Sequence, residues 1–440
     1  MLLRYEGFTT MIQEFKVSNY LSFRDEAILS FEASKENYME ENHVVAVSND
    51  VRLLRLAVIY GANASGKSNL LEGLERLRGF WFDKKKDIDE PTGFVPFLLD
   101  QETPHAPSKF ELKFWVNDTK YWYQLEVDQR QVHSEKLYYY KSVQPTMLFS
   151  RSLENGQSVI RFNAQAVKVA SAVSEEITLK CLPNMSFFAA RNKVNCSLPL
   201  IDSARDWMKT VMMPIIEPES EMFQYAGAKI QESEELKKYI LSFMRRADTN
   251  ITDISVEKEN VQLPSYLRNA IVEDKDMPDS TKEKLLGENS ISRMRAMFEH
   301  TVRNSRGEER YYLPKEAQSA GTQRVLGLET ALYRAMTDER FLFVDELESS
   351  LHPDVLMLVV KAFLEKGGRS QLVFTTHYDP LLNTVDHDLL RKDSVRFTEK
   401  DSSGNTTLFP LTDIRGLNKI SSFQRSYRSG LFGALPHIQL

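Results

Sequence analysis

The segment that most constrains this chain is an eight-residue glycine loop that lies between an apolar run and an amphipathic stretch. Residues 61–68 read Gly-Ala-Asn-Ala-Ser-Gly-Lys-Ser and fit the pattern G-x-x-x-x-G-K-[ST] at every position. The preceding residues 53–60 are largely apolar, and leucines follow at positions 70, 71, 74 and 77. The spacing of these leucines is helical, so the sequence predicts a strand, a phosphate-binding loop and a helix in that order.

The loop residues suit phosphate chemistry. Glycines let the backbone wrap closely around phosphates, so that successive N–H groups and the following helix N-terminus face the negative charge. We expect Lys67 to reach the β- and γ-phosphates and the Ser68 hydroxyl to ligate Mg²⁺. The alternative is a chance glycine loop, which arises in on the order of one or two chains in a hundred of this length.

A second motif is an apolar strand that ends in two carboxylates, Phe-Leu-Phe-Val-Asp-Glu at residues 341–346. We expect Asp345 to hold Mg²⁺ through its water shell and Glu346 to polarise the attacking water as a general base. Alone, such a motif is more often the end of a strand at the protein surface. The catalytic interpretation is favoured only because the same chain also contains the loop at 61–68.

Two further motifs extend this set. Ser319-Ala-Gly321 opens a predicted helix, where a hydroxyl and free N–H groups suit a phosphate, although an ordinary helix cap explains the motif equally well. Residues 371–377, Gln-Leu-Val-Phe-Thr-Thr-His, read as a buried strand that ends in His377. We expect His377 to hydrogen-bond the γ-phosphate, the alternative being a satisfied structural histidine.

Length and composition limit the remaining choices. A chain of 440 residues suggests two domains or one domain with a large insertion, and 42% hydrophobic with 27% charged residues is typical of a globular protein. The net charge of −6 does not indicate a basic surface for nucleic acid over the whole protein. Two cysteines are too few for a disulfide framework. With no apolar run of about 18 residues and no leader pattern, we expect a cytoplasmic protein.

The middle of the chain has a different character from its ends. Alternating stretches at residues 110–116, 121–127 and 132–139 predict an antiparallel meander, with Asn117 and Asp118 at its first turn. Residues 203–213, 232–247 and 280–298 read as helices. No heptad pattern is sustained over several turns, so the sequence predicts a compact insertion and no long coiled coil.

The four motifs, taken with the segment Glu348–Asp354, resemble the ABC-type ATPases that include SMC proteins, RecF-like repair ATPases and OLD-family proteins. The phosphate loop with Asn69, the acidic segment at 345–353 and Thr375-Thr-His377 are most similar to bacterial AAA family ATPases of abortive-infection and anti-phage loci. The resemblance implies an α/β P-loop NTPase fold of ABC type: a mixed sheet flanked by helices, with a large α+β insertion between Walker A and the signature motif.

This resemblance also implies a division of the chain and a set of nucleotide contacts. Residues 1–83 would form the N-terminal half of the head with Walker A, residues 84–313 a meander followed by a helical lid or arm, and residues 314–440 the half with the signature, Walker B, D-loop and switch histidine. The signature, Gln318-Ser-Ala-Gly321, departs from Leu-Ser-Gly-Gly. The implied nucleotide-binding residues are Gly61, Asn63, Ala64, Ser65, Gly66, Lys67, Ser68 and Asn69, with Ser319 and Gly321 contributed by a second copy.

The function implied is that of a Mg²⁺-dependent ATPase whose site is completed when two copies meet head to tail, with GTP left open as the nucleotide. We expect a homodimer or higher homo-oligomer that regulates an effector protein encoded nearby, in phage defence, with nucleic acid as another partner to consider and no membrane. The alternatives are a DNA-repair ATPase or a nuclease that acts directly on nucleic acid. A nuclease would use carboxylates of the insertion such as Glu257, Glu259, Asp274 and Asp276.

Overall fold

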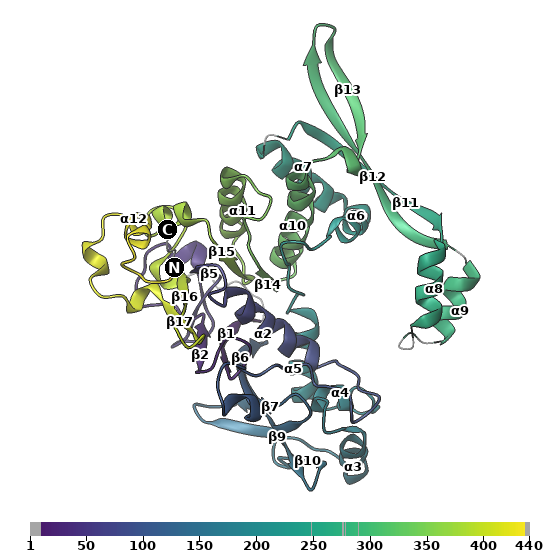
Figure 1. Cartoon of the computed structure of the whole chain (residues 1–440), viewed down its shortest axis with the longest axis vertical. Helices are drawn as coiled ribbons and strands as arrows, with labels where there is room; N and C mark the ends of the chain where they lie inside the picture. Colours follow the sequence, from purple (N-terminus) through teal and green to yellow (C-terminus); the bar gives the residue numbers. More distant parts are fainter. Residues whose placement is uncertain (1–9, 248, 275–276, 278, 289, 436–440) are drawn as a thin grey trace. The chain divides into compact units, whose positions relative to one another are not determined.

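The computed structural model describes residues 10–247, 249–274, 277, 279–288 and 290–435 (Figure 1). These residues form two compact units. Unit 1 contains the chain up to Pro218, together with Arg334–Ser349 and the residues from Val359 onward, and unit 2 contains Glu219–Tyr333 and Ser350–Leu358. Residues 84–218 therefore group with the phosphate loop, and the three-part division expected from the sequence stays a prediction.

Unit 1 contains a five-stranded mixed sheet in the order β14-β15-β5-β16-β17. The first four strands run parallel and the edge strand β17 is antiparallel. Every residue of β14, β15 and β5 is buried, as expected for parallel strands that read as continuous apolar runs. The five strands are β14 (Phe341–Val344), β15 (Gln371–Thr376), β5 (Leu56–Gly61), β16 (Val395–Lys400) and β17 (Thr406–Pro410).

The helix after the phosphate loop, α2 (Lys67–Phe80), contains the four leucines whose spacing predicts it. It contacts β5 on one side and β1 (Ile12–Ser18) on the other, so it lies between two sheets. Its buried side chains include Leu70, Leu74 and Leu77, which form part of the main apolar core of unit 1. A mixed α/β sheet with this covering helix confirms the predicted fold class.

The second sheet of unit 1 is antiparallel, with the order β10-β9-β8-β7-β6-β1-β2. The predicted meander is present, and Asn117 and Asp118 form its first turn with φ angles of 49° and 64°. β1 pairs with β6, so the meander continues the N-terminal strands in one sheet. The other strands are β2 (Ala27–Ser30), β6 (Ser108–Val116), β7 (Thr119–Val127), β8 (Val132–Tyr140), β9 (Pro145–Glu154) and β10 (Gln157–Phe162).

Shorter elements complete unit 1. The apolar run at 53–60 is divided because the buried Arg55 separates β4 from β5, and its guanidinium donates to the carbonyls of Asn42 and Gly367 at 2.8 and 2.7 Å. The elements are α1 (Glu40–His43), β3 (Val44–Ala46), β4 (Arg52–Leu54), α3 (Ser171–Lys180), α4 (Phe187–Arg191), α5 (Pro199–Thr210) and α12 (Phe423–Arg428).

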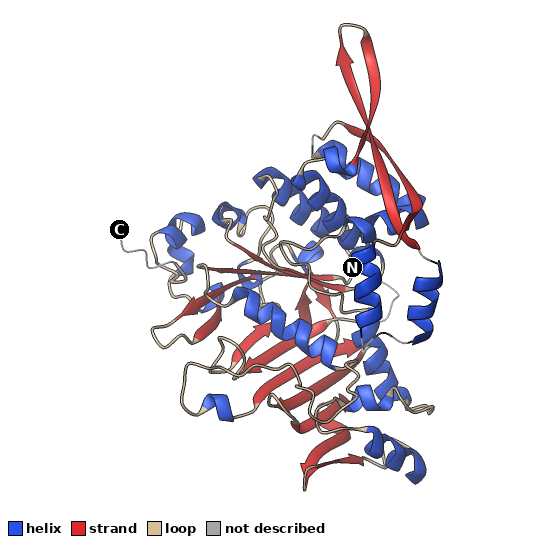
Figure 2. Cartoon of the chain, turned by 45° about the vertical axis from the view of Figure 1, so that its right-hand side comes forward, coloured by secondary structure: helices blue, strands red, loops and turns tan. Residues whose placement is uncertain are grey.

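Unit 2 combines a helical part with a three-stranded antiparallel sheet, whose strands are red in Figure 2 and carry the labels β11, β12 and β13 in Figure 1. The strand order is β11-β12-β13. β12 (Ser290–Asn304) is long enough to pair with β11 (Ile251–Gln262) over its first part and with β13 (Gly307–Pro314) over its last. The helices are α6 (Phe223–Glu232), α7 (Glu234–Arg246), α8 (Ser265–Glu273) and α9 (Asp279–Glu288). α10 (Ala320–Thr337) belongs to this unit up to Tyr333, and α11 (Pro353–Glu365) begins in it.

One expectation fails in unit 2. The predicted helix at 280–298 is wrong beyond residue 288, because residues 290–298 belong to β12. Apolar residues at 291, 294, 297 and 298 imitate helical spacing, but cross-strand pairing with β11 and β13 decides the local structure. Within unit 2, none of the residues of β13 is buried. No helix among the described residues is both long and apolar enough to cross a membrane.

Candidate functional site

The phosphate loop turns tightly between β5 and α2, and two positions in it require glycine. A Cβ on Gly61 would lie 2.3 Å from the Thr398 hydroxyl oxygen, closer than non-bonded atoms can approach. Gly66 has a φ of 103°, and a Cβ there would lie 2.5 Å from the hydroxyl oxygen of Thr406. Both glycines are therefore explained by steric crowding, and Gly66 also by its backbone conformation.

Hydroxyl groups from β16 and β17 hold the outer face of the loop. The hydroxyls of Ser65 and Thr398 are 2.6 Å apart, and the hydroxyl of Thr406 donates to the carbonyl of Ser65 at 2.8 Å. The Asn69 side chain donates to the hydroxyl of Ser22 at 2.8 Å. Ser22, Thr398 and Thr406 were not predicted from the sequence, because no local pattern marks residues that reach the loop through strand pairing.

The loop leaves some of its predicted ligand contacts accessible. Asn63, Ala64 and Ser68 are exposed, whereas Ser65 is buried and engaged with Thr398. Ala64 adopts a φ of 59°, in the left-handed region that residues other than glycine rarely occupy. The Ser68 hydroxyl is therefore accessible to a metal ion, as its predicted role requires.

Lys67 is the central cation of the site. Its Nζ donates to the carbonyls of Gly61 and Ala62 at 3.0 and 3.1 Å and lies 3.0 Å from Nε2 of His377. Burial lowers the pKa of Lys67, and the nearby carboxylates of Asp345, Glu346 and Glu348 oppose that shift. These contacts fold the ammonium group back over the loop, where it can exchange its present acceptors for phosphate oxygens.

The acidic pair lies at the end of β14. Asp345 is buried, and its Oδ1 accepts a hydrogen bond from the Thr375 hydroxyl at 2.5 Å. The same hydroxyl oxygen accepts from the backbone N–H of Glu346 at 2.8 Å. Glu346 has a φ of 46°, which turns the chain sharply away from the strand direction. Its side chain is 43% exposed, so the carboxylate is open to solvent and to a substrate water.

His377 follows the neighbouring strand β15 and connects the cation to the acids. Its Nε2 lies 3.8 Å from Oε1 of Glu346, and its backbone N–H donates to the Glu348 carboxylate. Burial and the adjacent charge of Lys67 lower the pKa of His377. A neutral ring matches the short contact with the Lys67 ammonium, because only a neutral imidazole offers a lone pair to accept that proton.

A scan against protein-family models finds the family described as "AAA domain, putative AbiEii toxin, Type IV TA system" at residues 56–164 and 220–383. These two segments cover more than half of the chain and contain all four of its motifs. The chain belongs to this AAA-domain family. The match supports the ABC/SMC-like interpretation at the level of an AAA ATPase domain, and a search of curated proteins finds no match.

Among solved structures, this AAA-family chain is similar to three SMC head domains. The SMC head domain from Thermotoga maritima has 13% identity and a TM-score of 0.40, with 91% of this chain and 98% of that chain covered. An Smc head bound to the C-winged helix domain of ScpA has 11% identity and a TM-score of 0.44, with 91% and 99% covered. An Smc head with an extended coiled coil, bound to the C-terminal domain of ScpA from Pyrococcus furiosus, has 12% identity and a TM-score of 0.42, with 93% and 99% covered.

The signature residues of this AAA-family chain lie in unit 2, at the start of α10. Ser319 directly precedes the helix and is exposed, and its hydroxyl accepts from the backbone N–H of Thr322 at 3.0 Å. Ser319 is therefore an N-cap. A Cβ on Gly321 would lie 2.8 Å from the carbonyl oxygen of Ser350, so glycine fits closely there. The predicted encounter of these residues with nucleotide held by a second copy stays a prediction.

Of the acidic residues that the nuclease alternative would use, the three that the structure describes are not gathered into one metal site. Glu259 is paired with Arg293 at 3.4 Å, Glu257 lies on the same strand opposite Arg295, and Asp274 follows α8. Asp276 lies outside the described residues. No group of three or more His, Cys, Asp or Glu residues within the described part of the chain is arranged to hold a metal ion.

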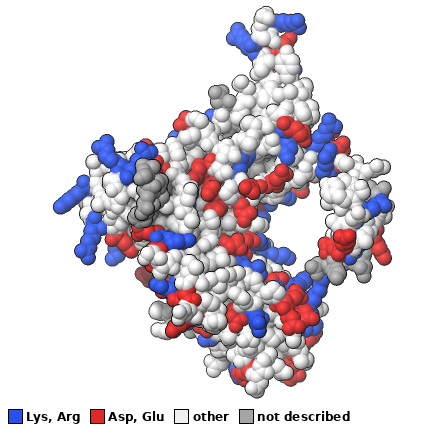
Figure 3. Space-filling model, viewed as in Figure 1, with Lys and Arg blue, Asp and Glu red and all other residues white. Residues whose placement is uncertain are grey.

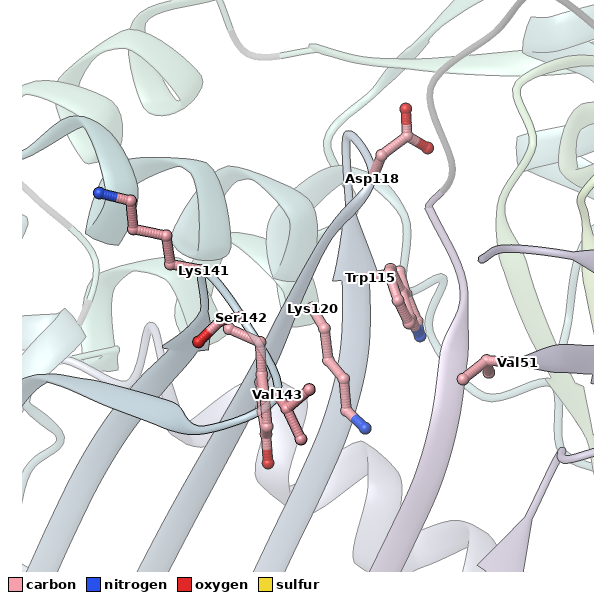
Figure 4. Close-up of a pocket in the computed structure, with 8 residues that line it drawn as sticks. Val51, Trp115, Asp118, Lys120, Lys141, Ser142 and Val143 are labelled. Atoms are coloured by element: carbon pink, nitrogen blue, oxygen red, sulfur yellow. The ribbon is translucent and has the colours of Figure 1, made fainter. Parts of the chain in front are cut away.

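Surface charge and cavities add two observations. On the face of the described residues in Figure 3, Lys and Arg are interspersed with Asp and Glu, consistent with the net charge of −6. A cavity of about 260 Å³ lies at turns of the antiparallel sheet, and its lining includes Trp115, Lys120 and Lys141 (Figure 4). The Lys120 ammonium lies 4.8 Å from the centre of the Tyr140 ring. None of the four sequence motifs contributes to this cavity.

Proposed function

We propose that this protein binds and hydrolyses ATP with Mg²⁺ in the manner of an ABC/SMC-like head. One observation carries the proposal. Lys67 Nζ lies 3.0 Å from His377 Nε2, which in turn lies 3.8 Å from the Glu346 carboxylate. A phosphate-binding cation, a histidine and a general base thus meet at the ends of three neighbouring parallel strands, the edge where α/β proteins bind ligands.

The residues at this edge fit a magnesium nucleotide. Mg²⁺ prefers oxygen ligands and is usually held by one or two carboxylates plus phosphates, which matches the Ser68 hydroxyl and the Asp345 carboxylate. When bound, the ion would neutralise the charge that develops on the transferring phosphoryl group. Lys67 would bind the β- and γ-phosphates, Glu346 would accept a proton from the attacking water, and neutral His377 would contact the γ-phosphate.

We further propose that the hydrolytic site is shared between two copies of the chain. Ser319 is exposed; its hydroxyl oxygen accepts from the backbone N–H of Thr322 and lies 2.8 Å from the Thr322 hydroxyl. Its proton would turn from that neighbour to a phosphate oxygen of the nucleotide. Together with the close-fitting Gly321, Ser319 would close on ATP bound by Asn63, Lys67 and their loop neighbours in the other copy. An effector protein would then respond to this closure. The toxin named in the family description supports a role in phage defence.

The test is the mass of a Glu346→Gln protein with and without Mg-ATP, measured by light scattering. The amide removes the base but keeps the size of the side chain, so ATP should stay bound and the mass should rise towards that of a dimer. Hydrolysis should fall by roughly 100-fold or more, because the substitution removes general-base catalysis.

Two matched variants make the result specific. Glu365→Gln, an exposed glutamate at the end of α11, makes the same chemical change away from the site and should leave hydrolysis unchanged. Lys67→Ala should lose nucleotide binding and show no ATP-dependent change in mass. An unchanged mass together with undiminished hydrolysis in Glu346→Gln would show that the base has been assigned wrongly. The same series of measurements with GTP shows whether the protein prefers adenine or guanine as the nucleobase.

A further inference from the structure

The hydroxyl of Thr375 has no role in the mechanism described so far, yet it contacts both members of the acidic pair. Thr375 lies on β15, is fully buried and precedes His377 by two residues. Its hydroxyl donates to Oδ1 of Asp345 at 2.5 Å and accepts from the backbone N–H of Glu346 at 2.8 Å. Since a hydroxyl has one proton to donate, that proton is committed to the Asp345 carboxylate.

The backbone at Glu346 needs this support. A residue with a side chain at a φ of 46° is less stable than in the right-handed region, so neighbouring contacts must hold it there. Thr375 supplies two of them, because its carbonyl also accepts from the N–H of Leu347 at 3.1 Å. The resulting turn directs the Glu346 carboxylate towards His377, 3.8 Å away.

We propose that Thr375 is a positioning residue for the hydrolytic step: its single hydroxyl ties the orientation of the Asp345 carboxylate to the position of Glu346. The metal ligand and the general base then keep a fixed relative geometry. The inference rests on the proposed ATPase function and adds a residue to the same site. A misplacement of about 1 Å in such a constellation can lower the rate on the order of 100-fold, so one buried hydrogen-bond bridge is enough to matter.

The next residue on the strand provides a matched control. Thr376 is also fully buried, but successive side chains of a strand point to opposite faces. Its hydroxyl oxygen accepts from the backbone N–H of Tyr378 at 3.0 Å. Thr375→Val and Thr376→Val therefore make the same chemical change at adjacent buried positions, and only the first removes the bridge between Asp345 and Glu346.

The experiment measures steady-state ATP hydrolysis, its Mg²⁺ dependence and the melting temperature for the wild type, Thr375→Val, Thr375→Ser and Thr376→Val. Thr375→Val should lower kcat by about 10- to 100-fold, keep KM for ATP within about 3-fold, and raise the half-saturating Mg²⁺ concentration, because Asp345 loses its orienting donor. Thr375→Ser keeps the hydroxyl and should restore kcat to within about 3-fold of the wild type, where Thr376→Val should also lie.

The outcomes separate this inference from the function on which it rests. A wild-type kcat in Thr375→Val, or an equal loss in Thr375→Val and Thr375→Ser, would overturn the positioning role while leaving the ATPase proposal intact. A wild-type protein that hydrolyses no ATP would overturn the proposed function, and the inference with it. If Thr375→Val lacks a cooperative melting transition, Thr375→Ala removes the same hydroxyl without a second methyl group and carries the same expectation.

Discussion

Two β regions of this protein differ in what surrounds their strands. In unit 1, every residue of β5, β14 and β15 is buried, and the side chains at their ends contact one another through Lys67, Thr375 and His377. In unit 2, β11 buries only Ile251 and Ile254, and β13 buries no residue. Regular hydrogen-bonded ladders are present in both regions, so backbone pairing alone does not distinguish them.

The difference lies in how closely each backbone position is surrounded. At the ends of the buried strands, side chains from distant parts of the sequence approach within van der Waals distance, so geometry is fixed and substitutions are poorly tolerated. β13 and the turn that joins it to β12 bury no side chain, so substitutions there mainly alter the strand itself. We therefore expect the same chemical change to have very different effects in the two regions.

The largest contrast should come from two glycines with similar backbone angles. Gly66 in the phosphate loop and Gly307 in the β12–β13 turn have φ angles of 103° and 112°. A Cβ on Gly66 would lie 2.5 Å from the Thr406 hydroxyl oxygen, whereas a Cβ on Gly307 would meet no atom within 4 Å. Gly66→Ala should weaken ATP binding by roughly 100-fold or more, because the loop must shift out of its phosphate-binding shape. Gly307→Ala should lower the stability of the fold only by the backbone strain of the new side chain, about 1–2 kcal/mol, and should leave the affinity for ATP unchanged.

Titration with a fluorescent ATP analogue, alongside thermal unfolding of each variant, measures both effects. Comparable losses of affinity in Gly66→Ala and Gly307→Ala would remove the distinction between a crowded site and an open ribbon. Normal affinity in Gly66→Ala would show that the loop adapts to a side chain at that position.

A second contrast concerns two arginines that each face a glutamate across a pair of strands. The side chains of Arg151 and Glu135 are both fully buried, and the Arg151 guanidinium also donates to Ser158 and to the carbonyl of Leu182 at 3.0 and 2.9 Å. The side chain of Arg293 is 57% exposed and lies 3.4 Å from Glu259. Arg151→Leu should destabilise unit 1 by about 3–5 kcal/mol, because Glu135 would be left buried without its cation.

Arg293→Leu is the matched substitution and should change the free energy of unfolding by less than about 0.5 kcal/mol. Urea unfolding of both variants, followed by circular dichroism, gives the two values. Burial already raises the pKa of the Glu135 carboxyl, and Arg151 opposes that rise. If Arg151→Leu were as mild as Arg293→Leu, Glu135 would have to be neutral in the wild-type fold, and the pair would not be ionic.

The same contrast explains which parts of the molecule could be read from the sequence. The phosphate loop, the Asp345-Glu346 pair and His377 each follow a largely apolar run, so a local pattern marks both the strand and the residues after it. Thr398 and Thr406 reach the loop from strands more than 300 positions away, and no spacing in the sequence carries that information. The error at β12 arose because the apolar residues at 291, 294, 297 and 298 have helical spacing, whereas the pairing with β11 and β13 that makes this segment a strand leaves no local signal.

Unit 2 nevertheless has a buried helical part, and one residue in it is unusual. Glu329 on α10 is fully buried; its Oε2 accepts from the Tyr239 hydroxyl at 2.8 Å, and its Oε1 has no hydrogen-bond partner among the described residues. Burial raises the pKa of Glu329 to about 8, although the Tyr239 hydrogen bond and the charge of Arg246 oppose the rise. At neutral pH the folded state therefore holds this carboxyl protonated, whereas the unfolded state ionises it.

The sign of the resulting pH dependence follows from that difference. Because the folded pKa of about 8 exceeds the ordinary glutamate value of 4.5, the contribution of Glu329 to stability is fully present below pH 4.5 and is lost as pH rises towards 8.

Glu329→Gln keeps the shape and an acceptor for Tyr239 but cannot ionise. We expect it to unfold like the wild type near about pH 5 and to be more stable by on the order of a few kcal/mol near about pH 9. Calorimetric scans at both pH values test this, with the exposed Glu283 on α9 changed to Gln as the control. If the unfolding transition shifts equally with pH in the wild type and in Glu329→Gln, the titrating group lies elsewhere. If Glu329→Gln alone removes the pH dependence of one transition, that transition is the unfolding of the helical part of unit 2 that buries Glu329.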